Sequence, residues 1–254
     1  MRSMTWLGLV AAAGLMACDD DNTIEPPAPP QATVFTASGD ITARVEEFRT
    51  ALGAANGGTA GEQAAGRREV NWDGAGANPF NDRDDFPPAF FNTNVKVGAV
   101  FTTAGTGLRN SSNLFADVNP TYAAQFNFFS ADKIFAPVGS NLLDQLFQVA
   151  GQPTPAVVRG FGIVLSDVDV ASKTSIELFA QDGTSLGVYN APVRSDAGGN
   201  SFVGVTFADA VIARVRITLG TGALGANVND ISAGGTVDVV VLDNLIYGEP
   251  HRAF

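Results

Sequence analysis

Apolar and polar residues alternate with a period close to two along most of the chain from Arg67 onward. The clearest case is segment 211–220, VIARVRITLG, in which Val215 and Ile217 fall on one face and Arg214 and Arg216 on the other. This alternation predicts a half-buried antiparallel strand. The same pattern predicts further strands over segments 95–103, 122–130, 142–151, 156–169, 174–189, 200–207 and 236–248.

Two of these segments also predict a hairpin turn or a position within the sheet. Asp182 and Gly183 divide segment 174–189 at a dipeptide that favours the positive φ angles of a tight hairpin. Segment 236–248 is apolar on both faces, which predicts a central strand. Short strands without intervening helices or a fixed repeat predict an all-β fold, an antiparallel, jelly-roll-like β-sandwich over residues 67–250.

A helical period occurs only before the predicted sandwich, over residues 40–53. Ile41, Val45, Phe48 and Leu52 recur at helical spacing, with Asp40 as a capping residue. The Gly/Ala-rich stretch that follows predicts a flexible connector, so residues 39–66 are interpreted as one short helix and a connector.

The first residues have the composition of a secretory signal peptide. Arg2 precedes a short apolar run, which is too short to cross a bilayer as a helix. Residues 15–18, Leu-Met-Ala-Cys, resemble the lipobox of bacterial lipoproteins. The resemblance implies that a signal peptide, residues 1–17, is removed and that Cys18 is then acylated. Several acyl chains anchor a protein durably to a membrane, where one does so only marginally.

The residues after Cys18 are acidic and rich in proline, DDDNTIEPPAPPQAT. Such a composition cannot form a packed core and favours an extended spacer, so residues 18–38 are predicted to be a stalk. The expected location is the cell envelope, with a lipid-anchored domain on the periplasmic face or the outer surface.

The closing segments, SFVGVTF at 201–207, IARVRITLG at 212–220 and DVVVLDNLIYGEP at 238–250, resemble a group of uncharacterised secreted bacterial proteins. Several of those proteins carry a PEP-CTERM-type sorting tail, which the N-terminal lipid is expected to replace in this chain. The resemblance covers roughly residues 67–250 and implies no biochemical role.

Composition excludes several classes of function. The 254 residues carry a formal charge of −11, which disfavours binding to a phosphate backbone, so no nucleic-acid partner is expected. A single cysteine excludes an internal disulfide, and a single histidine excludes a His-rich zinc site. That histidine, His251, is expected at a frayed C-terminal end.

One cluster of acidic residues suggests a cation. Asp167 and Asp169 end a predicted strand on one face, and Asp243 and Asn244 lie in the final strand. Calcium prefers six to eight oxygen ligands, so these four residues form a candidate calcium site, the only cofactor expected. The alternative is that these aspartates cap turns by accepting backbone N–H bonds.

Segment 70–92 combines aromatic and acidic residues. An exposed tryptophan beside carboxylates suits a sugar, because its ring stacks on apolar sugar faces and the acids accept from hydroxyls. The candidate ligand-binding residues are Trp72, Asp73, Asp82, Asp84 and Asp85. The alternative is that the aromatic residues are buried in the core.

Three functions therefore compete. The favoured one is a lipid-anchored, non-enzymatic envelope module that binds a carbohydrate or a protein partner. The second is a glycan hydrolase or lyase with paired carboxylates, for which Glu69 and Glu177 are the glutamates expected in the sheet region. The third is a structural subunit of the envelope or matrix. No nucleophile elbow or P-loop motif is found in the sequence.

Overall fold

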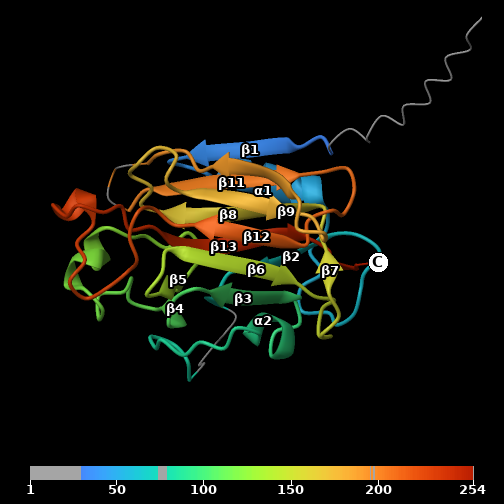
Figure 1. Cartoon of the computed structure of the whole chain (residues 1–254), viewed down its shortest axis with the longest axis horizontal. Coiled ribbons are helices and arrows are strands. Elements are labelled where there is room, and N and C mark those ends of the chain that lie inside the picture. The colour runs from blue at the N-terminus through green and yellow to red at the C-terminus, as the bar shows by residue number, and fades with distance from the viewer. Residues whose placement is uncertain (1–29, 74–78, 195, 197, 254) are drawn as a thin grey trace, which may run out of the picture.

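The computed structural model describes residues 30–73, 79–194, 196 and 198–253 (Figure 1). The predicted signal peptide and Cys18 lie outside the described residues. The helices are α1 (Thr42–Leu52) and α2 (Phe90–Thr93), with 3-10 turns η2 (Pro120–Ala124) and η3 (Ile231–Ala233). The strands are β1 (Thr33–Ser38), β2 (Arg67–Val70), β3 (Ala99–Thr103), β4 (Gly107–Ser111), β5 (Ile134–Val138), β6 (Leu142–Phe147), β7 (Ala156–Val157), β8 (Gly160–Ser166), β9 (Ser175–Phe179), β10 (Ser185–Asn190), β11 (Asn200–Thr206), β12 (Arg214–Thr218), β13 (Val241–Gly248) and β14 (His251–Arg252).

All strands except β7 and β14, which pair with each other, form two packed antiparallel sheets. The larger sheet has the order β1-β11-β8-β13-β5-β4, with β2 also paired to β13, and the smaller has the order β10-β9-β12-β6-β3. Figure 1 looks onto the sheets, and the strands of both run across the view. The predicted all-β antiparallel sandwich is therefore confirmed, as is the central position of segment 236–248, which contains β13.

The main core lies between the two sheets. Phe161, Ile163 and Leu165 of β8 meet Ile176 of β9 and Ile217 of β12, and all five side chains are fully buried. Complete burial of a side chain of this size contributes about 1.5–3 kcal/mol each. The alternation of β12 is also confirmed, because Ile217 faces this core while Arg216 is exposed.

A second core covers the opposite face of the larger sheet. The predicted helix forms as α1, and its Phe48 packs on Phe35 of β1 and Phe202 of β11. Gly162 leaves room for this ring, since a Cβ there would lie 2.6 Å from Phe48. Burial on both faces explains why β8 and β13 lack an exposed polar face.

The hairpin and the helix cap follow local sequence signals. β9 and β10 pair antiparallel on either side of Gly183, whose φ is +85°. Asp40 accepts a hydrogen bond from the Thr42 backbone N–H at 3.1 Å. The hairpin prediction is confirmed, and Asp40 does bind a backbone N–H of the first turn, although the N-cap position itself is taken by Ile41.

Four sequence predictions require correction. Residues 33–38 belong to β1, which pairs with β11, so the predicted stalk overlaps the folded domain. Segment 122–130 is not a strand, because Asn119 caps the 3-10 turn η2 and Pro120 begins it.

The connector, which the sequence predicted to be flexible, is held in place by Arg68. Arg68 donates hydrogen bonds to the carbonyls of Gly57, Thr59 and Gly61. His251 lies in β14, 3.0 Å from Glu62, and not at a frayed end.

Candidate functional site

Trp72 is buried and does not form part of a sugar-binding surface. Its side chain has 0% exposure, and its ring stacks on Phe135 with centroids 3.9 Å apart and an interplanar angle of 7°. Its Nε1 donates to the Asp243 carbonyl at 2.6 Å. The prediction of an exposed ring is therefore wrong, and the buried alternative is confirmed, because the two packed sheets enclose this ring.

Asp73 and Asp82 hold loops together. Asp73 accepts hydrogen bonds from the backbone N–H groups of Ala131 and Asp132. Asp82 accepts from the backbone N–H of Ser112 at 2.8 Å and from its hydroxyl at 2.6 Å. These two carboxylates bind donors of neighbouring loops, and neither lines the hollow that Asp84 and Asp85 border.

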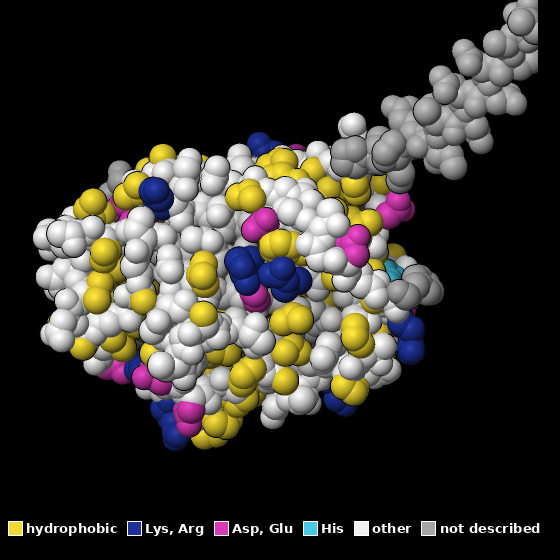
Figure 2. Space-filling model, in the orientation of Figure 1, with side chains coloured by type: hydrophobic (Ala, Val, Ile, Leu, Met, Phe, Trp, Pro, Cys, Tyr) yellow, Lys and Arg dark blue, Asp and Glu magenta, His cyan; other side chains and the backbone are white. Residues whose placement is uncertain are grey.

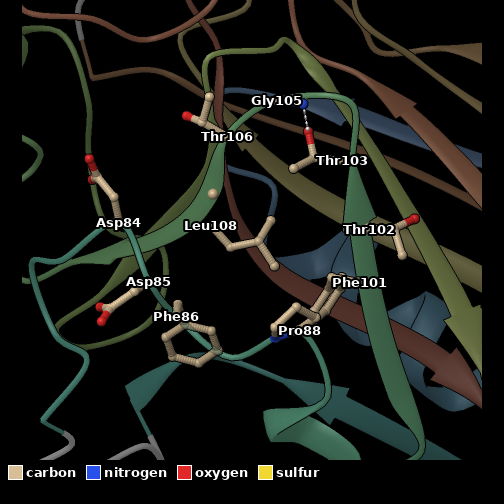
Figure 3. Close-up of a pocket in the computed structure, with 11 residues that line it drawn as sticks. Asp84, Asp85, Phe86, Pro88, Phe101, Thr102, Thr103, Gly105, Thr106 and Leu108 are labelled. Atoms are coloured by element: carbon tan, nitrogen blue, oxygen red, sulfur yellow. Dashed lines mark hydrogen bonds between the residues drawn. The ribbon is translucent and has the colours of Figure 1, made fainter.

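Asp84 and Asp85 lie instead at a surface hollow of about 470 Å³. Figure 3 shows these two aspartates on one side of it and Thr102 and Thr103, from β3, on the other, with Leu108 between them. The isolated bridge between Asp85 and Leu108 brings segment 84–88 beside β4. The hollow therefore forms where three segments that are separate in sequence meet.

The floor of the hollow is apolar and its rim is polar. Phe86, Phe101 and Leu108 form the floor and are 2%, 0% and 3% exposed. The rim residues Thr102 and Thr106 are exposed. A ligand in the hollow would meet an apolar floor surrounded by a polar rim, a composition found at small-molecule sites.

Both aspartates of the hollow are paired with arginine. Arg109 donates to Asp84 at 2.7 Å, and Arg83 donates to both oxygens of Asp85, at 2.9 and 2.5 Å. The hydrogen bonds from Arg83 hold the pKa of Asp85 below its ordinary value. Asp85 is therefore an ionised hydrogen-bond acceptor at neutral pH.

The two candidate catalytic glutamates lie in different sheets, and each interacts with other side chains of the protein. Glu69 of β2 forms ion pairs with Arg49 and Arg67, at 2.8 and 2.7 Å. Glu177 of β9 accepts from the Ser185 hydroxyl and lies opposite Arg216 in the strand pairing. Figure 2 shows the arginine and acidic side chains gathered at the middle of this face. The two glutamates do not form a catalytic pair.

A cluster of acidic residues forms at the end of β8. One carboxylate oxygen from each of Asp167, Asp169 and Asp230 lies within 4.8 Å of the other two. Asp167 directly follows β8, and Asp230 is the N-cap of η3 and accepts from the Ser232 backbone N–H. Asp238 is buried beside them and accepts from the backbone N–H of Asp169.

The electrostatic environment of this cluster is acidic. Burial, followed by the charges of Asp230, Asp169, Asp238 and Asp196, raises the pKa of Asp167 to about 8. Burial and the adjacent Asp230 raise the pKa of Asp169 to about 7. Among the described residues, no Lys or Arg forms a salt bridge with Asp167, Asp169 or Asp230.

Asp243 is not part of this cluster, and the neighbouring Asn244 is 3% exposed with no hydrogen-bond partner for its Oδ1. The register between β13 and β8 shifts between Leu242 and Leu245, and this irregularity changes the alternation of side chains. Asp243 instead accepts from the backbone N–H groups of Phe129 and Ser130 and from the Ser130 hydroxyl. Its predicted role as a ligand of the same cation as Asp167 is therefore wrong.

Asp230 and Asp238 were missed at the sequence level. Asp230 lies in residues 220–235, which are rich in Gly and have no alternating pattern, and Asp238 lies near the start of the predicted final strand, 236–248. The only local signal is that Asp230 precedes Ser232 in a capping arrangement, which predicts a turn and not a ligand. Their proximity to Asp167 depends on how the loops meet.

Comparison with known proteins gives no family. No helix among the described residues is long and apolar enough to span a membrane. No protein-family model matches the chain, and no curated protein is significantly similar to it.

Two solved structures are similar in part. One is the enzymatically active domain of tailspike protein 4 from bacteriophage CBA120, with 12% identity and a TM-score of 0.29 over 66% of this chain and 21% of that chain. The other is a two-domain protein of unknown function from Bacteroides fragilis, with 15% identity and a TM-score of 0.23 over 60% and 46%. The chain spans less than half of either, and these TM-scores carry no functional argument.

Proposed function

We propose that this protein is a non-enzymatic carbohydrate-binding module, anchored to the cell envelope by a lipid on Cys18. The observation that carries the proposal is the hollow beside β3 and β4, which Asp84 and Asp85 border on one side and Thr102 and Thr103 on the other, with an apolar floor between them. A sugar has the matching chemistry, since its hydroxyls donate to carboxylates and its C–H faces contact apolar groups.

The charges in the hollow support binding over hydrolysis. A glycoside hydrolase needs one carboxylic acid with a raised pKa beside a second, ionised carboxylate. Arg83 lowers the pKa of Asp85, which removes it as a general acid at neutral pH. An ionised carboxylate fixed by an arginine is instead a well-oriented acceptor for sugar hydroxyls.

The anchor is proposed from the lipobox resemblance at residues 15–18. Fifteen positions separate Cys18 from Thr33, where β1 begins, and a chain of that length reaches at most about 50 Å. The domain would therefore stay close to the membrane surface. Labelling with a fatty-acid analogue in a bacterial host tests the lipid anchor. Cys18→Ser is expected to abolish incorporation of the label and recovery of the protein in the membrane fraction.

The binding activity is tested by measuring the affinity of the chain for a panel of bacterial and plant polysaccharides, together with release of sugar product. We expect binding without product. Asp84→Ala with Asp85→Ala is expected to lower affinity by about tenfold to a hundredfold, because each removes hydrogen bonds to a charged acceptor. The matched control is Asp209→Ala, which removes an exposed aspartate outside the hollow and is expected to bind normally.

Two results would contradict the proposal. Release of reducing ends that depends on Asp84 or Asp85 would replace the binding module with a hydrolase. Absence of binding to every polysaccharide, with recovery of an envelope protein by crosslinking at the hollow, would replace the sugar with a protein partner.

A further inference from the structure

Two loops that are distant in sequence bring three carboxylates together at one end of the sandwich. Asp167 and Asp169 follow β8, and Asp230 begins η3, in the orange-red loop at the left of Figure 1. Like charges held this closely repel each other, and burial strengthens the repulsion because water no longer screens it. Something must compensate for this charge when the carboxylates are ionised.

The protein itself supplies little compensation. Asp167 is 0% exposed, and neither of its carboxylate oxygens has a hydrogen-bond partner. The carboxylate oxygens of Asp169 also lack a donor when ionised, since a hydrogen bond with the Asp230 carboxyl requires a proton on one of the two. Asp230 does accept bonds, from the backbone N–H of Val239 at 2.9 Å and of Ser232 at 2.8 Å. These bonds orient Asp230 but leave Asp167 a buried charge without a donor, which is costly.

The spacing of the oxygens fits a single calcium ion. Calcium binds oxygen at about 2.3–2.6 Å, so two oxygens on opposite sides of the ion are separated by about 4.6–5.2 Å at most. One oxygen from each of the three aspartates already lies within 4.8 Å of the others. Three oxygens at most 4.8 Å apart lie within about 2.8 Å of a common centre, so a shift of a few tenths of an ångström brings all three into contact with one ion.

We infer that Asp167, Asp169 and Asp230 form a binding site for one Ca²⁺ ion. Three carboxylates favour Ca²⁺ over Mg²⁺, which usually keeps several waters and takes one or two carboxylates from the protein. Asp238 adds negative charge beside the site. It also holds the backbone of the loop after β8, since it accepts hydrogen bonds from the backbone N–H groups of Asp169 and Val170.

The ion would join the loop after β8 to the loop that contains η3. Calcium would then stabilise this end of the sandwich, whether or not the hollow beside β3 and β4 binds a sugar. The calcium site shares no residue with that hollow, so the two proposals can be tested independently.

The test uses the full chain treated with EDTA and dialysed. Isothermal titration with CaCl₂ is expected to show one binding event, and MgCl₂ a much weaker one. Thermal unfolding is expected to shift upward by about 5–10 °C when calcium is present at 100 times its dissociation constant. No binding heat and no thermal shift up to 5 mM CaCl₂, which exceeds the weakest dissociation constants of extracellular calcium sites, about 1 mM, would overturn the proposal.

Variants assign the ion to its ligands. Asp167→Asn and Asp169→Asn are each expected to weaken calcium binding by about tenfold or more, because ligand charge sets the affinity. The control Asp209→Asn removes the same charge near the other end of the strands, since Thr206 of β11 pairs with Gly160. If Asp167→Asn does not fold, the test uses Asp169→Asn, because Asp169 is partly exposed. Unchanged affinity in Asp169→Asn and any folded Asp167→Asn would overturn the assignment.

Discussion

Arg68 and Glu249 form a buried bidentate ion pair across 181 positions of sequence, with Nε–Oε2 and Nη2–Oε1 distances of 2.6 and 2.7 Å. Their side chains are 0% and 1% exposed. Arg68 also donates to the carbonyls of Gly57 and Thr59, and Glu249 accepts from the backbone N–H of Gln63. The pair therefore fastens the connector to the larger sheet.

Loss of either partner is expected to destabilise the fold strongly. Arg68→Met and Glu249→Gln should each lower the free energy of unfolding by about 3–5 kcal/mol, because the remaining group is left buried and poorly compensated. Urea denaturation measures this. Arg44→Met, which breaks the exposed pair with Glu47, is the control and should change stability by about 0–1 kcal/mol. Equal effects at both sites would contradict the structural role of the buried pair.

Trp72 is expected to be shielded from solvent. The chain has a second tryptophan, Trp6, and Trp6→Phe leaves Trp72 as the only tryptophan. Since Trp72 is 0% exposed, its fluorescence in this variant should be blue-shifted and weakly quenched by iodide. Unfolding in urea should shift the emission to the red and increase quenching. Equal quenching of the folded and unfolded protein would show that the ring is exposed.

Asp243 is expected to make stability depend on pH. Burial raises its pKa to about 6 from an ordinary value of 3.8, although hydrogen bonds from Phe129 and Ser130 oppose the shift. The folded state therefore binds the proton more tightly than the unfolded state. Its contribution to stability is fully present below about pH 4 and falls by roughly 3 kcal/mol as the pH rises through 6.

The comparison with Asp243→Asn isolates this contribution, because the other acidic groups titrate in both proteins. The free energy of unfolding of the native chain, relative to the variant, should decrease between pH 4 and pH 6 in urea denaturation. A difference that stays constant over this range would show that the pKa of Asp243 is not raised.

Gly162 is expected to be required for the packing of α1. A Cβ at this position would lie 2.6 Å from Phe48 and 2.9 Å from Phe202. Gly162→Ala should therefore cost about 1–3 kcal/mol, and less than that in a Phe48→Leu background. Gly58→Ala is the control, since no atom lies within 4 Å of its added Cβ. Independent, additive effects of the Gly162 and Phe48 substitutions would contradict the contact.

The sequence by itself determined the fold class and most of the strands. Alternation places Val215 and Ile217 on one face of β12 through the geometry of an extended chain, whatever lies around it. The helical spacing of Val45, Phe48 and Leu52 likewise requires only local geometry, and all three are buried. These features need no knowledge of which segments become neighbours.

The sequence places Asp167 and Asp169 together at the end of β8, but only the tertiary structure decided which other residues join them. Asp230 meets Asp167 because two loops converge at one end of the sandwich, and no local pattern encodes that contact over sixty positions. The same applies to Trp72, which follows β2 and whose ring is covered by Phe135 of β5. Alternation reports which face of a strand is apolar, but sheet order and loop packing determine which side chains meet across the fold.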